Sequence, residues 1–131
     1  ELGGIDKPVI LKRGFASTLE EFLFAAEYIV NSGNKNIILC ERGIRTFENS
    51  TRNTLDISSV AFIKEYTEIP IIVDVSHSLG RKDIVNRVSK AIKAIGADGL
   101  MIEVHPDPSA ALSDKRQQLN FLEFSNLIQE L

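Results

Sequence analysis

Four short apolar runs recur at nearly even intervals, and this repeat constrains the fold more than any other feature of the sequence. The runs cover residues 8–11, 37–40, 69–73 and 100–102. Each is short, rich in β-branched residues and without polar alternation, a pattern typical of a strand that is covered on both faces. The runs therefore predict four buried β-strands.

The segments between the runs carry the apolar spacing of amphipathic helices. A residue that can cap a helix N-terminus precedes each segment: Ser17 or Thr18, Asp56 or Ser58, and Asp83. Gly33 and Gly96 stand where the first and third helices should end, and a last helical pattern covers residues 121–131. We therefore predict a single α/β domain over residues 1–131, made of four consecutive βα units with a parallel sheet.

Charge and cysteine content exclude several classes of protein. The chain carries 15 basic and 18 acidic side chains, for a net charge of −3, so its overall field gives no reason to expect nucleic acid or a membrane surface as a partner. No apolar stretch reaches the roughly 18 residues that a membrane-spanning helix needs. Cys40 is the single cysteine, which excludes an internal disulfide and suits a reducing compartment such as the cytoplasm.

Charged residues follow all four predicted strands. Lys12, Arg42, Asp74 and Glu103 are separated by 30, 32 and 29 residues, close to the roughly 30 residues of one βα unit. Because side chains alternate across a strand, these four residues can lie on one face at the carboxyl end of the sheet. Ligands of parallel α/β folds bind at that end, so we expect a binding site there.

The loop after the second strand is rich in arginine. It holds Arg42, Arg45 and Arg52, whose guanidinium groups match the oxygens of phosphate and carboxylate. A phosphorylated anion is therefore the expected ligand, with Lys12 adding a point charge from the neighbouring strand. The alternative is a solvated loop with a local ion pair, such as one between Glu41 and Arg45.

The loops after the third and fourth strands combine imidazole and carboxylate groups. His77 follows the third strand, and Glu103, His105, Asp107 and Asp114 follow the fourth. Such donors suit a divalent ion such as manganese, iron, cobalt or zinc, with His105 as a competing ligand. A lone histidine in a loop is more often a hydrogen-bonded structural residue. Cys40 lies in an apolar run, which favours a buried residue over a nucleophile.

Four strings give the sequence a specific resemblance. KPVILKRGF, NIILCERGIRTFENSTRNTLDIS, IIVDVSHSLGRKD and IEVHPDPSAALSDKRQQL resemble the metal-dependent 3-deoxy-D-arabino-heptulosonate-7-phosphate synthases, in the subfamily related to 3-deoxy-octulosonate-8-phosphate synthase. The resemblance implies an enzyme that condenses phosphoenolpyruvate with erythrose 4-phosphate in the shikimate pathway. It also implies an eight-stranded (β/α) barrel of about 250 residues, of which this chain would be strands five to eight.

The resemblance assigns roles to individual residues. Lys12 and Arg42 would contact phosphoenolpyruvate, and His77, Glu103 and Asp114 would be three metal ligands. We expect Lys12, Asp74 and His77 to serve catalysis, and Lys12, Arg42 and Arg45 to bind substrate. The family's fourth ligand, a cysteine on the first strand, is not Cys40, and its Lys-Pro-Arg-Thr loop and fourth-strand arginine are also missing here. Val75 and Leu79 replace the usual proline and glycine around His77.

A half-barrel leaves two strand edges unpaired, and such edges promote association. We therefore expect the chain to be a fragment with little or no activity alone, which pairs with another copy or with the missing half. Two alternatives stay open. The chain could be a non-catalytic half-barrel that binds a phosphorylated metabolite or a partner, or an octulosonate-type enzyme that uses arabinose 5-phosphate. The IRTFENSTRNTLD string argues against the latter, because that group more often carries an aromatic-glycine string after CERG.

Overall fold

The computed structural model describes residues 1–131 as one parallel sheet with the strand order β1-β2-β3-β4. The strands are β1 (Val9–Lys12), β2 (Ile37–Glu41), β3 (Ile71–Asp74) and β4 (Gly99–Met101). The helices are α1 (Leu19–Asn31), α2 (Ile57–Tyr66), α3 (Val75–Leu79), α4 (Val85–Ala94) and α5 (Phe121–Glu130), with short 3₁₀ turns at Leu2–Gly4 and Pro108–Ala110. The predicted α/β architecture with its parallel sheet is confirmed.

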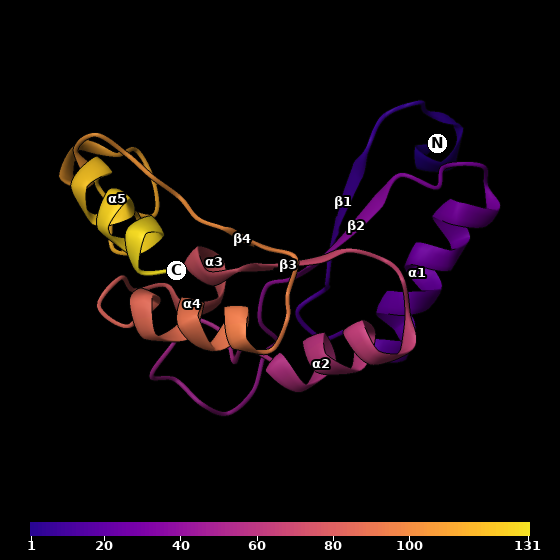
Figure 1. Ribbon diagram of the computed structural model, residues 1–131, viewed down its shortest axis with the longest axis horizontal. Coiled ribbons are helices and arrows are strands. Elements are labelled where there is room, and N and C mark those ends of the chain that lie inside the picture. The colour runs from indigo at the N-terminus through magenta and orange to yellow at the C-terminus, as the bar shows by residue number, and fades with distance from the viewer.

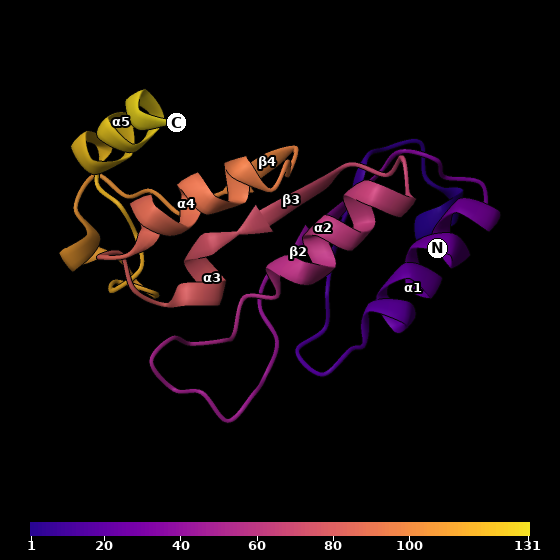
Figure 2. The same cartoon turned by 60° about the horizontal axis from the view of Figure 1, so that its bottom comes forward.

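The two faces of the sheet are covered unequally. Helices α1, α2 and α4 lie along one side of the strands, and no helix lies across the other side (Figures 1 and 2). We call these the helix-covered face and the open face. Leu39, Ile71 and Val73 point to the helix-covered face and are fully buried in the core. Ile10, on the open face, is 46% exposed, so the sheet buries its apolar side chains mainly on one side.

Local capping signals account for most of the helix ends. The Thr18 side chain accepts a hydrogen bond from the Glu21 amide, and the Asp56 side chain accepts one from the Ser59 amide, as predicted. Gly33 and Gly96 follow α1 and α4 with φ of 114° and 87°, a backbone conformation that glycine adopts without strain. These two glycines confirm the predicted ends of both helices.

Two sequence-based predictions about the third βα unit were wrong. Asp83 does not cap α4, because its carboxylate pairs with Arg81 instead. The segment after β3, described from the sequence as a loop, begins with α3, which Asp74 caps by accepting a hydrogen bond from the His77 amide. The competing partners of Asp83 and Asp74 explain both differences.

The strand bounds shift by one or two residues from the predicted runs. β3 begins at Ile71 because Pro70, which has no N–H, can offer only its carbonyl, and that carbonyl accepts from Leu39. β4 ends at Met101, beyond which β3 offers no partner because the chain has turned into α3.

No helix in the fold has the length and apolar character needed to cross a membrane.

Candidate functional site

The carboxyl end of β3 carries a buried carboxylate that bonds to a lysine and a histidine. Asp74 is fully buried and accepts a hydrogen bond from Lys12 Nζ at 2.8 Å, while its Oδ2 lies 2.9 Å from His77 Nδ1. Burial by itself raises the pKa of Asp74, but the hydrogen bonds from Lys12 and the His77 amide, with the charges of both side chains, outweigh it and leave that pKa lowered. Asp74 is thus an ionised anchor that positions Lys12 and His77.

The predicted metal ligands meet at the same end of the sheet. Suitable atoms of His77, Glu103 and Asp114 all lie within 4.8 Å of one another. His77 Nε2 is 3.5 Å from Glu103 Oε1. The three side chains are 22%, 28% and 27% exposed, so each is partly buried yet open to solvent. We call these three residues the acidic cluster.

The donor chemistry of the acidic cluster fits a divalent metal ion. One imidazole and two carboxylates are the donors that manganese, iron, cobalt and zinc accept. Because the ionised Asp74 can only accept, His77 Nδ1 donates to it, and Nε2 is the ring nitrogen that faces Glu103. A carboxylate that orients a histidine in this way is the usual support of a metal-ligating imidazole. The residues present therefore fit such an ion.

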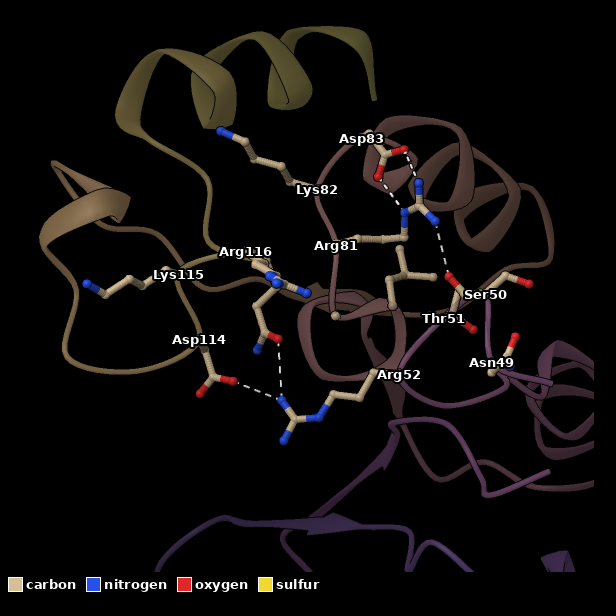
Figure 3. Close-up of a pocket in the computed structure, with 13 residues that line it drawn as sticks. Asn49, Ser50, Thr51, Arg52, Arg81, Lys82, Asp83, Asp114, Lys115 and Arg116 are labelled. Atoms are coloured by element: carbon tan, nitrogen blue, oxygen red, sulfur yellow. Dashed lines mark hydrogen bonds and ion pairs between the residues drawn. The ribbon is translucent and has the colours of Figure 1, made fainter. Parts of the chain in front are cut away.

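Neighbouring groups fix the two carboxylates of the acidic cluster. The Glu103 amide donates to the Ser76 hydroxyl on α3 at 2.9 Å, and its carboxylate accepts from the side chain of Gln117 at 2.7 Å. Asp114 accepts from Arg52 at 2.9 Å and has a φ of 56°, an uncommon conformation for a residue other than glycine. Figure 3 shows Asp114 and Arg52 facing each other from separate loops.

The predicted substrate-binding arginines of the β2–α2 loop are placed differently from one another. The Arg42 guanidinium lies 4.0 Å above the ring of Phe15, and its buried Nε has no hydrogen-bond partner. An unpaired, buried N–H of a cation favours an anion beside it. Arg45 is exposed, and its guanidinium lies 5.6 Å from the same ring. Arg52 contacts the acidic cluster instead, so the loop divides its arginines between two places.

Sequence reasoning missed a buried ion-pair network on the helix-covered face. Arg13 Nη1 lies 3.0 Å from Glu41 and 2.9 Å from Asp56, and it also donates to Ser59. Glu41 accepts from the Gly43 amide at 2.7 Å, which fixes the start of the loop after Arg42. We call Arg13, Glu41 and Asp56 the buried network. The alternation of side chains was the available signal, because Arg13 and Glu41 each sit one residue out of phase with the open face.

Burial also affects the pKa of Asp56 in the buried network and the pKa of the neighbouring Cys40. Desolvation raises the pKa of Asp56, but hydrogen bonds from Ser59 and Arg13 outweigh it and lower that pKa overall. Cys40 is fully buried, as expected, and burial together with the Asp74 charge raises the pKa of its thiol to about 11. A thiol held protonated in this way is a poor nucleophile.

His105, considered as a competing metal ligand, lies outside the acidic cluster. Its Nδ1 accepts a hydrogen bond from the Asp107 amide at 3.1 Å. β4 ends at Met101, before Glu103 and His105, so neither of these two residues lies on a strand face. The Glu41 to Arg45 ion pair, the basis of the solvated-loop alternative, is also replaced, since Glu41 binds Arg13.

Comparison with known proteins gives consistent matches over most or all of the chain. The model of the DAHP synthetase I family matches residues 1–131. The phospho-2-dehydro-3-deoxyheptonate aldolase of Thermotoga maritima is 60% identical over 129 residues, covering 98% of this chain and 38% of that protein. The 2-dehydro-3-deoxyphosphooctonate aldolase of Methylococcus capsulatus is 33% identical over 82% of this chain and 41% of its own length.

Solved structures match in the same way. The crystal structure of phospho-2-dehydro-3-deoxyheptonate aldolase (DAHP synthase) from Thermotoga maritima superposes with a TM-score of 0.95 over 98% of this chain and 38% of that one. A truncated form of 3-deoxy-D-arabino-heptulosonate 7-phosphate synthase from the same organism gives the same TM-score and is covered to 49%. The chain therefore spans less than half the length of these relatives.

Proposed function

The chain belongs to the DAHP synthetase I family, and from this premise we propose that it is the phosphoenolpyruvate-binding and metal-binding half of a 3-deoxy-7-phosphoheptulonate synthase. Such an enzyme joins phosphoenolpyruvate to erythrose 4-phosphate and releases phosphate. The observation that carries the proposal is the convergence of Lys12 with the His77, Glu103 and Asp114 cluster at one end of the sheet, linked through Asp74.

Lys12 and Arg42 are the proposed contacts for phosphoenolpyruvate. Lys12 is held by Asp74 and remains 40% exposed, so its ammonium group keeps donors for an incoming anion. Arg42 stacks on Phe15 and has an unpaired Nε, which a phosphate or carboxylate oxygen would satisfy. Asp74 is fully buried and bonded to Lys12 and His77, so its proposed role is to position these two residues rather than the catalytic role expected from the sequence. Arg45, at the exposed side of Phe15, is a further proposed contact.

His77, Glu103 and Asp114 are the proposed metal ligands. A divalent ion bound there supplies Lewis-acid chemistry toward the aldehyde oxygen of the sugar phosphate. The protein residues do the rest of the work. Asp74 holds the His77 ring with Nε2 toward the cluster, Gln117 orients Glu103, and Lys12 and Arg42 neutralise the charge of the enol substrate.

The open half-barrel is the basis for proposing that the chain acts only with a partner. β1 and β4 are the two edges of the sheet, and the open face exposes Ile10. A second set of strands would cover both edges and this face, and would supply the seat for erythrose 4-phosphate that this chain lacks. We propose that the partner is the complementary half-barrel or a second copy of the chain, and that the isolated chain has little or no synthase activity.

Reassembly of two halves tests this proposal. The purified chain is mixed with the complementary half of the Thermotoga maritima enzyme, with manganese present, and phosphoenolpyruvate consumption is followed with erythrose 4-phosphate. We expect activity in the mixture and not in either half, and its loss in His77→Ala. A reassembled complex that stays inactive while binding phosphoenolpyruvate would instead support the non-catalytic binder and overturn the synthase proposal.

Substrate choice is tested in the same mixture. Identity is higher to the heptonate enzyme, at 60%, than to the octonate enzyme, at 33%, which favours erythrose 4-phosphate over arabinose 5-phosphate. We expect turnover with erythrose 4-phosphate alone. Faster turnover with arabinose 5-phosphate would assign the chain to the octulosonate group.

A further inference from the structure

A polar cavity of about 760 Å³ lies beside the acidic cluster. Three loops form it, from residues 49–52, 79–83 and 114–117, and Leu79 is its single apolar lining residue. Figure 3 shows side chains from all three loops around this space. The loops follow β2, β3 and β4, so the cavity belongs to the same end of the sheet as the acidic cluster but takes its walls from the loops rather than the strands.

The charge of the cavity wall is opposite to that of the chain. The cationic lining residues outnumber the acidic ones by three, whereas the whole chain has a net charge of −3. The cations are Arg52, Arg81, Lys82, Lys115 and Arg116, and the anions are Asp83 and Asp114. Like charges gathered in one concavity repel each other, and an anion in the space relieves that repulsion.

Three of the five cations already form ion pairs, and Arg52, which binds Asp114 at 2.9 Å, is one of them. Arg81 makes a bidentate contact with Asp83, at 2.7 and 2.6 Å, and Lys82 binds Glu123 of α5 at 2.6 Å. Lys115 and Arg116 form no ion pair with any carboxylate of the chain. These two residues therefore bring positive charge to the cavity that the chain itself does not balance.

Arg52 is shared between the cavity and the acidic cluster. Its Nη1 alone contacts Asp114 and Gln117, so Nε and Nη2 keep their hydrogens for another acceptor. The Arg52 amide donates to the Leu79 carbonyl at 3.0 Å. Gly80 has a φ of 65°, and a Cβ there would lie 2.6 Å from the Arg52 Cβ. The stem of Arg52 is therefore packed into a fixed place in the wall.

We propose that this cavity binds the phosphate of a small phosphate monoester, at a site separate from the anion contacts of Lys12 and Arg42. Arg52, Lys115 and Arg116 would bind the phosphate oxygens, because guanidinium groups match phosphate geometry and charge-assisted hydrogen bonds are the strong ones. The cavity volume leaves room for the organic part of the ligand. The proposal rests on the charge and shape of the cavity and does not depend on the proposed synthase function.

Titration of the ¹⁵N-labelled chain, free of metal, tests the site. Inorganic phosphate and glycerol 3-phosphate are the two probes, and amide shifts are followed by NMR. We expect both to give saturable shifts at residues 50–52, 80–82 and 115–117. Shifts confined to the amides near Lys12 and Arg42 would overturn the proposal. Binding of inorganic phosphate without glycerol 3-phosphate would overturn the monoester and leave a site for the free ion only.

Matched arginine variants complete the test. Arg116 and Arg87 are both exposed, so replacing either leaves the core intact. We expect Arg116→Gln to weaken glycerol 3-phosphate binding about tenfold, as loss of a charged hydrogen-bond donor does, and Arg87→Gln on α4 to leave it unchanged. Equal affinity in Arg116→Gln and Arg87→Gln would contradict the proposal.

Discussion

The buried network and the acidic cluster lie at the same end of one sheet, yet they are built in opposite ways. In the buried network a single guanidinium, from Arg13, lies between two carboxylates; Arg13 and Glu41 are 4% and 1% exposed, and Asp56, at the edge of the network, is 24% exposed. In the acidic cluster two carboxylates and an imidazole gather at 22–28% exposure. The first set of charges contains its own counter-ion, whereas the second leaves room for one.

The difference teaches which charges hold the fold and which are available for ligands. Arg13 ties the ends of β1 and β2 to the N-terminus of α2, and its Nε and Nη1 groups donate to protein acceptors. The acidic cluster is oriented from outside, by Asp74, Gln117 and Arg52, and its facing atoms stay free for an ion. A charge cluster whose side chains are oriented by neighbouring groups, while its facing atoms stay free for a ligand, is typical of a binding site.

The largest expected effect comes from removing the cation of the buried network. Arg13→Met leaves Glu41 buried without its partner, and we expect a loss of about 3–5 kcal/mol in the free energy of unfolding. Urea denaturation followed by circular dichroism measures it. Arg52→Met, which removes a half-exposed arginine, serves as the control and should cost about 1 kcal/mol or less. Similar losses in both variants would erase the distinction between the two regions.

Addition of a metal ion tests the acidic cluster in the same way. Manganese at 100 times its dissociation constant should stabilise the chain by about 2.7 kcal/mol, because the ion binds the folded state. His77→Ala should abolish this gain, and His105→Ala, which removes a histidine outside the acidic cluster, should retain it. Thermal denaturation with and without manganese measures the effect. A gain in stability that survives His77→Ala and disappears in His105→Ala would place the metal site at His105 rather than in the acidic cluster.

Acid titration tests Asp74, which positions His77, and Asp56 of the buried network. The pKa of Asp74 and the pKa of Asp56 are lowered in the folded chain. A carboxyl group with a lowered pKa stabilises the fold above its unfolded pKa of about 4 and loses that contribution as the pH falls through the folded value. We expect stability to decline below about pH 4, and the decline to be shallower in Asp74→Asn.

Asp6→Asn is the control for this titration, because Asp6 forms no ion pair. Its stability should follow that of the unmodified chain across the acid range, measured by urea denaturation at each pH. A decline equally steep in Asp74→Asn and in Asp6→Asn would show that Asp74 is not among the groups that couple folding to pH.

The last prediction concerns a reaction rate, that of Cys40, which lies beside Asp74. Because burial raises the pKa of its thiol to about 11, little thiolate is present at pH 8. Alkylation by iodoacetamide in the folded chain should be on the order of 100-fold slower than in urea, as the smaller thiolate fraction requires. Mass spectrometry of timed samples measures the rate. Equal rates in both states would place Cys40 in an accessible position.

The sequence predicted the parallel strand order and the gathering of its charged residues because both follow from local periodicity. A βα repeat of about 30 residues returns each strand to the same end of the sheet, and alternation within a strand places Lys12 and Asp74 on one face. The structure joins these two residues directly and brings His77, Glu103 and Asp114 together. The catalytic and binding roles assigned to them stay predictions.

Other features depended on competition between partners that are distant in the sequence. Arg52 lies 62 residues from Asp114, and Arg13 lies 28 residues from Glu41. Asp83 could cap a helix or bind Arg81, and no local pattern decides between these partners. The cavity between the three loops has no sequence signature at all.

Sequence by itself therefore determined the elements, their order and the face on which each strand residue lies. Tertiary structure alone decided which charges neutralise one another and which remain open, because that choice depends on distances set only after the loops have packed. The same alternation that sent Lys12 to the open face sent Arg13 to the helix-covered face, where Glu41 and Asp56 enclose it. Contact across the fold then separated a structural ion network from a candidate binding site.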